Sequence, residues 1–297
     1  MKKWILFLFC TTFAFNAKCQ QKDSTDNQPF FRGFQLRQSF QTADFQQCPA
    51  QIQFTLPGNG KDSWLINAGV STGIAPLSSS DITSKVVAEY HRNTILDAPQ
   101  NNYQIGYNMQ YLQEGDDNLR LLLTSNVKYI RDVIDSTHSL AITLNLAGYR
   151  NGKHGLDWDH PGYLSDGKYT YQFSPYLEAQ YQQFFVSGKQ HAGSIVRPLA
   201  DLSASIAINK PKLKSKKLTA PTKLIELTVD YTNRYAIVNT TDNGEKFTKL
   251  FKAGLNYYFI NTGSKSISFG ASYNQGSDPL NGLKDQKFWQ FSLQVQI

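Results

Sequence analysis

The sequence is poor in cysteine and, beyond its first residues, in apolar runs. Of its three cysteines only Cys48 lies beyond residue 19, so the remainder of the chain can form no intramolecular disulfide. No run of 18 apolar residues follows the start of the chain, which excludes transmembrane helices. Helical periodicity is nearly absent, and no phosphate-binding loop or cysteine pair is present. These absences predict an all-β chain stabilised by packing and sheet closure.

The first 19 residues have the layout of a secretory signal peptide. A basic start, Lys2-Lys3, precedes the apolar run Trp4–Phe15, which is too short to cross a bilayer. The triplet Ala17-Lys18-Cys19 then places small residues at positions −3 and −1 of a cleavage site before Gln20. We therefore expect signal-peptide cleavage near Cys19/Gln20. The alternative is a lipid-bearing Cys19, although a lysine before the cysteine fits a lipoprotein signal poorly.

Removal of this segment changes the charge balance only slightly. It takes away three lysines and no acid, which leaves 27 basic and 23 acidic residues and a net charge of +4. A charge this small gives no reason to expect nucleic acid as a partner. The expected organisation is a signal peptide over 1–19, a periplasmic N-terminal arm over 20–50 and one large β domain over 51–297.

Apolar and polar residues alternate along most of the chain with the two-residue period of a strand. In the last ten residues Trp289, Phe291 and Leu293 share one face, and Gln290 and Gln294 share the other. Similar segments bring the count to about twelve strands, most close to the ~9–11 residues that a tilted barrel strand needs. They are 51–56, 64–70, 86–90, 103–111, 119–133, 140–146, 171–185, 196–208, 225–231, 251–259, 267–273 and 288–297.

Between Gln51 and Ile297 the pattern resembles that of bacterial outer-membrane β-barrel proteins. The resemblance is architectural and selects no functional family. It implies an all-β fold, a single antiparallel up-and-down transmembrane β-barrel whose terminal strand pairs with the first strand near Ile52. It also implies residence in the outer membrane of a Gram-negative bacterium, with outer-membrane lipid around the barrel and the barrel-assembly machinery as partner during biogenesis. A secreted β-sandwich or periplasmic β protein is the soluble alternative.

Counting strands back from Ile297 gives one unexpected result. The long segments Arg150–Lys168 and Lys210–Pro221 fall at the same end of the barrel as both termini. The turns at that end of an outer-membrane barrel are normally short. Either the strand count is wrong or this barrel has unusual inner loops.

Charged residues on the polar strand faces would point into the barrel lumen, where they must pair or be hydrated. They are either the selectivity lining of a solute pathway or a charge network that fills a narrow lumen. These lumen-lining candidates are Glu89, His91, Arg120, Lys128, Asp132, Glu178, Arg197, Asp201, Glu226, Asp230 and Lys252.

Two predicted loops carry concentrated polar groups. His154, Asp157, Asp159 and His160 are of the types that bind zinc or calcium, but their spacing matches no defined metal loop. A polar surface loop is the preferred interpretation, with no metal or cofactor. The basic run Lys210–Lys217 would contact lipid phosphates or an acidic partner, or, as is more usual, form a solvated loop.

Enzyme motifs lack the context they need. Gly69–Gly73 matches the Gly-x-Ser-x-Gly pattern, but a nucleophile elbow requires a strand-to-helix turn and no helical pattern follows. An outer-membrane phospholipase would need a serine and a histidine two residues apart on an outward face. His91 is followed by Arg92 and Asn93, and His138 stands directly before Ser139 in a turn, so neither fits this arrangement. We therefore expect a protein that is not an enzyme.

Two functions of different class follow. The first is a narrow solute channel, porin-like and passive. The second is a structural or assembly barrel that anchors a surface or secretion complex through a periplasmic or surface protein partner. Its N-terminal arm contains the aromatic cluster Phe30–Phe34, which would dock into the lumen as a plug or bind that partner. An outer-membrane hydrolase is the least favoured alternative.

Overall fold

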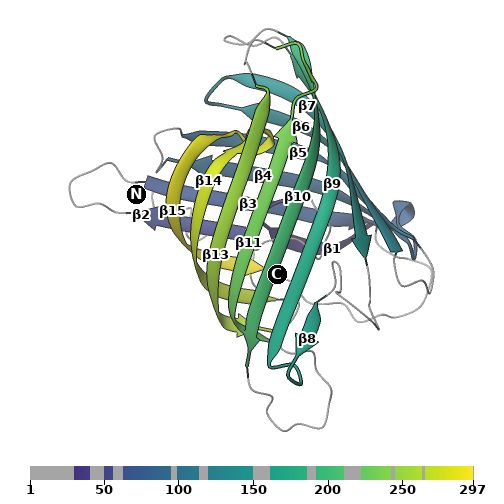
Figure 1. The fold of residues 1–297 in the computed structure, drawn as a ribbon. Coiled ribbons are helices and arrows are strands. Elements are labelled where there is room, and N and C mark those ends of the chain that lie inside the picture. The colour runs from purple at the N-terminus through teal and green to yellow at the C-terminus, as the bar shows by residue number, and fades with distance from the viewer. Residues whose placement is uncertain are drawn as a thin grey trace, which may run out of the picture.

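The computed structural model describes residues 30–40, 50–55, 63–94, 99–113, 120–149, 161–185, 192–210, 222–241, 245–262 and 265–296. Twelve antiparallel strands in up-and-down order close into a barrel (Figure 1), so the predicted fold class and strand count are confirmed. The barrel strands are β2 (Ala50–Thr55), β3 (Ser63–Ile74), β4 (Ile82–Asn93), β5 (Gln100–Leu112), β6 (Arg120–Asp132), β7 (Thr137–Tyr149), β9 (Tyr169–Phe185), β10 (Gly193–Asn209), β11 (Lys223–Tyr235), β13 (Phe247–Asn261), β14 (Ser266–Asp278) and β15 (Leu283–Gln296).

Three short strands and two single-turn helices complete the described part of the chain. β8 (Gly162–Leu164) pairs with the start of β9, and β12 (Val238–Asn239) pairs with the start of β10. β1 (Phe31–Arg37) pairs with β3, and the 3₁₀ turns are η2 (Ala75–Leu77) and η3 (Pro279–Asn281). Among the described residues, no helix is long and apolar enough to cross a membrane.

The barrel closes between its last and its first predicted strands. Leu293 of β15 lies opposite Ile52 of β2, and Val295 lies opposite Ala50. The Gln290 side-chain amide adds a hydrogen bond of 2.8 Å to the Gln51 side-chain oxygen. The predicted closing pair is therefore confirmed, although the ladder at this seam has only three register pairs.

The barrel is apolar outside and polar inside. On β15 the Trp289 side chain is 68% exposed, and Phe291 and Leu293 are also exposed. The residues between them, Gln290 and Ser292, are buried. A soluble β protein buries its apolar face, whereas a barrel in lipid exposes it. This arrangement fits the architecture of outer-membrane barrels.

Strand direction fixes which connections share an edge. We call the edge where β1 begins and β15 ends the terminus edge, and the opposite one, with the β14–β15 turn, the distal edge. The connections from β7 to β9 and from β10 to β11 leave from the terminus edge. Because twelve strands are confirmed, the miscount is ruled out. The long segments after β7 and β10 do belong to the end that carries the termini.

The first strand of the wall is split in two. β2 pairs with β3 residues 63–67, and β1 pairs with β3 residues 69–74 on the same edge of β3. The β1 register shifts between Arg32 and Phe34, at a bulge whose central Gly33 has φ +64°, a value that favours glycine. The chain therefore leaves the wall after Arg37 and rejoins it at Ala50.

Candidate functional site in the barrel lumen

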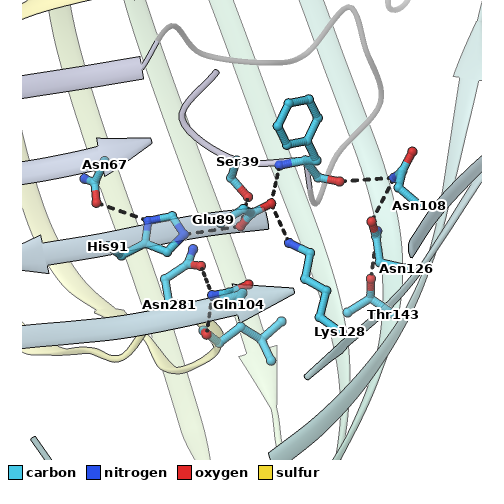
Figure 2. Close-up of polar contacts among 12 residues, drawn as sticks. Ser39, Asn67, Glu89, His91, Gln104, Asn108, Asn126, Lys128, Thr143 and Asn281 are labelled. Carbon is cyan, nitrogen blue, oxygen red and sulfur yellow. Dashed lines mark hydrogen bonds and ion pairs between the residues drawn. The ribbon is translucent and has the colours of Figure 1, made fainter. Parts of the chain in front are cut away.

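A short segment, Ser39–Phe40, enters the lumen where the wall strand is split. Phe40 is fully buried, and its backbone amide donates a hydrogen bond of 2.7 Å to Glu89 Oε1. The Ser39 hydroxyl donates to Glu89 Oε2 at 3.1 Å. On the other side, Asn108 Nδ2 donates to the Phe40 carbonyl at 3.1 Å, as Figure 2 shows. The lumen wall thus holds Ser39–Phe40 mainly through polar groups.

Gly69 on β3 makes the room for this segment. A Cβ at residue 69 would lie 3.1 Å from the Phe40 ring and 3.0 Å from Glu89 Cγ, tighter than ordinary contacts. The Arg37 guanidinium lies 5.9 Å from the Phe40 ring centroid, so the ring has a cation as neighbour. A glycine is needed here for close approach rather than for an unusual backbone angle.

Glu89 is the centre of the polar network in Figure 2. Besides Ser39 and Phe40, it contacts Lys128 Nζ at 2.8 Å and His91 Nε2 at 3.2 Å. The Glu89 side chain is completely buried, and the Lys128 side chain nearly so. An ionised carboxylate is costly to bury unless it is paired and hydrogen-bonded. Its contacts meet that requirement and tie Ser39–Phe40 to β4 and β6.

Neutral amides extend the network around the wall. Asn108 Nδ2 also donates to Asn126 Oδ1 at 2.8 Å, and Asn126 Nδ2 donates to Thr143 Oγ1 at 3.1 Å. This ladder crosses β5, β6 and β7 beside Ser39–Phe40 (Figure 2). On the side of the Phe40 carbonyl, the inserted segment therefore meets a ladder of uncharged hydrogen-bonding groups.

A second element enters the lumen at the distal edge. Leu280 of η3 is buried against Ile130 and Ala141. Gln104 Nε2 donates to the Leu280 carbonyl at 3.1 Å and to Asn281 Oδ1 at 2.9 Å. The β14–β15 turn is thus fastened to the inner wall.

The lumen next to Leu280 contains a small cavity. A cavity of about 10 Å³ lies between the walls and Leu280, which is room for about one water molecule. Its lining residues are Gln104, Asn126, Lys128, Ile130, Ala141, Thr143 and Leu280.

Three of the predicted lumen residues, Glu89, His91 and Lys128, meet in the Glu89 network. Four others make separate contacts on the inner wall. Arg197 binds Glu245 through two nitrogens and Gln182 Oε1 at 2.9 Å. Asp201 accepts from Thr232, Glu178 accepts from Gln180 at 2.6 Å, and Glu226 accepts from Lys223 at 2.5 Å and from Tyr258.

The remaining candidates lie at strand ends or are only half-buried. Asp132 accepts the backbone amides of Ile134 and Asp135 at the β6–β7 turn, at 2.8 and 3.1 Å. Asp230 and Lys252 lie opposite each other on β11 and β13, and Arg120 begins β6 half-buried. The role of the eleven candidate residues as the lining of a solute pathway stays a prediction.

The residues that occupy the lumen differ from those expected. In the cluster Phe30–Phe34, Phe31 and Phe34 belong to β1 and are 55% and 53% exposed. Of the two alternatives for this cluster, the lumen plug is therefore wrong, and binding to a partner stays a prediction. Phe40 lies in the lumen instead. Sequence reasoning also missed Leu280 and Glu245. Each is a single residue outside a periodic segment, so alternation gives no signal for it.

Several predicted features lie outside the described residues. These are the signal peptide 1–19 with Cys19, Cys48, the loop with His154, Asp157, Asp159 and His160, and residues 211–217 of the basic run. In the part of the chain that is described, no three histidine, cysteine, aspartate or glutamate side chains gather as metal ligands.

Ser71 of the Gly69–Gly73 motif lies within a continuous strand. β3 runs on to Ile74 and is followed by the 3₁₀ turn η2, which has three residues. The buried Ser71 hydroxyl donates to Gln35 Oε1 at 3.4 Å. The strand-to-helix turn that a nucleophile elbow needs is absent at this position.

Comparisons with known proteins add little. No family model matches the chain, and no curated protein matches it. Four solved chains match. One of them comes from work titled "Unveiling the Mechanism Behind the in-meso Crystallization of Membrane Proteins"; it is 13% identical, has a TM-score of 0.38, and the match covers 84% of this chain and 82% of that chain. Function therefore has to be inferred from the barrel's own residues.

Proposed function

We propose that the protein is a narrow channel for small polar solutes in the outer membrane of a Gram-negative bacterium, closed in this conformation by Ser39–Phe40. The exposed apolar strand faces support the membrane placement, because water would disfavour so large an apolar surface. The barrel wall would face outer-membrane lipid, and the barrel-assembly machinery would insert it. The proposal assigns the barrel no catalytic role.

The lining of the lumen supports the passage of polar solutes. About half of the buried side chains among the described residues are asparagine, glutamine, serine or threonine, which can exchange hydrogen bonds with a polar solute. Conduction requires binding that is weak enough to release the solute. The charged side chains Glu89, Arg197 and Glu226 have partners within the wall, and such partners reduce the field of each charge in the pathway.

The main support for the proposal is that polar contacts hold Ser39–Phe40 against the lumen wall. Hydrogen bonds to Glu89 and Asn108 connect this segment to the lumen wall. The bond from Asn108 joins neutral groups and contributes about 0.5–1.5 kcal/mol, and the two bonds to the Glu89 carboxylate contribute about 1.5–3 kcal/mol each. The segment therefore suits a reversible closure better than a permanent filling.

A second function is favoured by the cavity beside Leu280. Its volume of about 10 Å³ leaves room for about one water, so side chains fill the lumen beside Leu280, as they would in a barrel that serves as an anchor. Such a barrel would act as a structural anchor for a surface or secretion complex through a protein partner.

Planar-bilayer recordings of the refolded protein test the two functions. We expect the unsubstituted barrel to show rare, small current steps, and Phe40→Ala to show frequent steps of larger conductance. Phe184→Ala is the matched control because Phe184 is also a buried inward phenylalanine, on β9 away from Ser39–Phe40. It should behave like the unsubstituted protein.

Silence from both the unsubstituted protein and Phe40→Ala, with correctly refolded barrels, would contradict the channel and support the anchor. Equal currents from Phe40→Ala and Phe184→Ala would instead show that Ser39–Phe40 is not the closure.

A further inference from the structure

The outward face of β3–β6 carries a group of aromatic and basic residues near the distal edge. We call Trp64, Tyr90, Arg92, Tyr103 and Arg131 the arginine–aromatic patch. They come from four neighbouring strands, and Tyr90, Tyr103 and Arg131 follow one another in register across β4, β5 and β6. The Glu89 network lies on the other side of the same wall, so the patch plays no part in closing the lumen.

The patch is built from direct contacts. The Arg92 guanidinium lies 4.1 Å from the Trp64 ring centroid and 3.5 Å from the Tyr90 hydroxyl. The Tyr90 and Tyr103 rings stack with centroids 4.6 Å apart and planes 25° apart. Arg131 on β6 lies opposite Tyr103, so the two arginines come from the strands on either side of β5.

Neither arginine of the patch has an ion pair within the described ranges. Inside the barrel the opposite holds, since Arg197 pairs with Glu245 and Arg234 pairs with Asp278. A guanidinium group is a planar set of donors suited to a phosphate, which it binds with short, charge-assisted hydrogen bonds. The apolar exposed side chains of Ile105 and Val127 continue the same outward face toward the terminus edge.

We propose that the arginine–aromatic patch binds the phosphate headgroup of a membrane lipid between Arg92 and Arg131, with the acyl chains along Ile105 and Val127. The stacked tyrosines and Trp64 would lie at headgroup level, where aromatic residues are enriched in membrane proteins. This inference rests on the membrane placement proposed above and does not depend on whether the lumen conducts.

Native mass spectrometry of the refolded barrel in detergent tests the site. The probes are dioleoyl phosphatidic acid and dioleoylglycerol, which has the same chains without the phosphate. Arg92→Gln/Arg131→Gln should retain phosphatidic acid at least about tenfold less than the unsubstituted barrel, because the phosphate loses both of its guanidinium partners. Retention of dioleoylglycerol should not change.

The matched control is Lys249→Gln/Lys287→Gln. These lysines are exposed on β13 and β15, near the distal edge of another part of the wall, and their loss removes the same charge. The control should retain phosphatidic acid within about twofold of the unsubstituted barrel. Equal losses in both double variants would overturn the site, since general charge attraction would then explain binding.

Two further outcomes separate the remaining explanations. Full displacement of phosphatidic acid by millimolar inorganic phosphate would show a site for a free anion and overturn the lipid proposal. A chain that never refolds into a detergent-soluble barrel would contradict the membrane placement itself. A refolded barrel without selective retention contradicts only the lipid site, and silent bilayer recordings contradict only the channel.

Discussion

The backbone amide of Phe40 donates a hydrogen bond of 2.7 Å to the carboxylate of Glu89, 49 residues further along the chain. The same carboxylate pairs with Lys128. One buried charge pair therefore stabilises both the wall and the segment inside it, and substitutions can separate these two effects.

Removing the Glu89 charge should destabilise the barrel strongly. Glu89→Gln leaves Lys128 buried without its carboxylate, and the loss of one member of a buried pair typically costs about 3–5 kcal/mol. Glu89→Gln/Lys128→Met should recover part of that loss because no uncompensated charge remains. Urea titration of the refolded barrel in detergent measures both. Equal stabilities for the single and double variants would show that the pair does not act as a unit.

Adding a side chain at Gly69 should displace Phe40 from the lumen. Gly69→Val places a Cβ about 3 Å from both the Phe40 ring and the Glu89 side chain. Arg37, buried next to Phe40, should then become accessible to trypsin, with cleavage after it at least about tenfold faster. Ala68→Val, on the outward face of the same strand, is the control and should be cut at the original rate. Resistance of Gly69→Val to trypsin would mean that the lumen accommodates the extra methyl groups.

The closing seam predicts which cysteine pair can form a disulfide. In a Cys48→Ser background, Ile52→Cys/Leu293→Cys places two cysteines directly opposite each other on one face of the β2–β15 ladder. We expect spontaneous cross-linking and an increased resistance to unfolding in hot detergent. Gln51→Cys/Leu293→Cys should stay reduced, because residues 51 and 293 point to opposite faces. Cross-linking of the second pair rather than the first would place the seam one residue out of register.

Loss of the Glu245 charge should destabilise the pairing of β10 with β12 near the distal edge. Glu245 binds the fully buried Arg197, and Asn239 Nδ2 donates to the Glu245 carbonyl at 2.8 Å beside β12. Glu245→Gln should therefore raise hydrogen exchange over residues 236–241 by about tenfold or more, the equivalent of one lost charge-assisted bond. Lys246→Gln, the exposed neighbour, should leave exchange unchanged. Unaltered exchange in Glu245→Gln would show that Gln182 alone holds Arg197.

The alternation of apolar and polar residues was sufficient to predict the barrel strands, because each strand has apolar residues on its outward face and polar residues on its inward face. It predicted the seam as well, since Ile52 and Leu293 lie on the first and last such segments. β1 was missed because the bulge at Gly33 breaks the two-residue period within a seven-residue strand.

The site was predictable only in part. Glu89, His91 and Lys128 were identified as inward residues from strand period alone. Their meeting depends on how β4, β5 and β6 are staggered, which no local pattern encodes. Phe40 gave no signal because a single apolar residue in a polar stretch is normally unremarkable.

The split wall strand also determines how a pull on the N-terminus would reach the lumen. Ser39–Phe40 is joined to strand on both sides, to β1 before it and to β2 after it, so it cannot withdraw as a free end. A load applied ahead of Phe30 acts along β1 and stresses its six register pairs with β3 in shear before it reaches Phe40. A partner that pulled on this end would therefore have to break most of the β1–β3 register pairs at once. Displacing Phe40 in this way would require a high force.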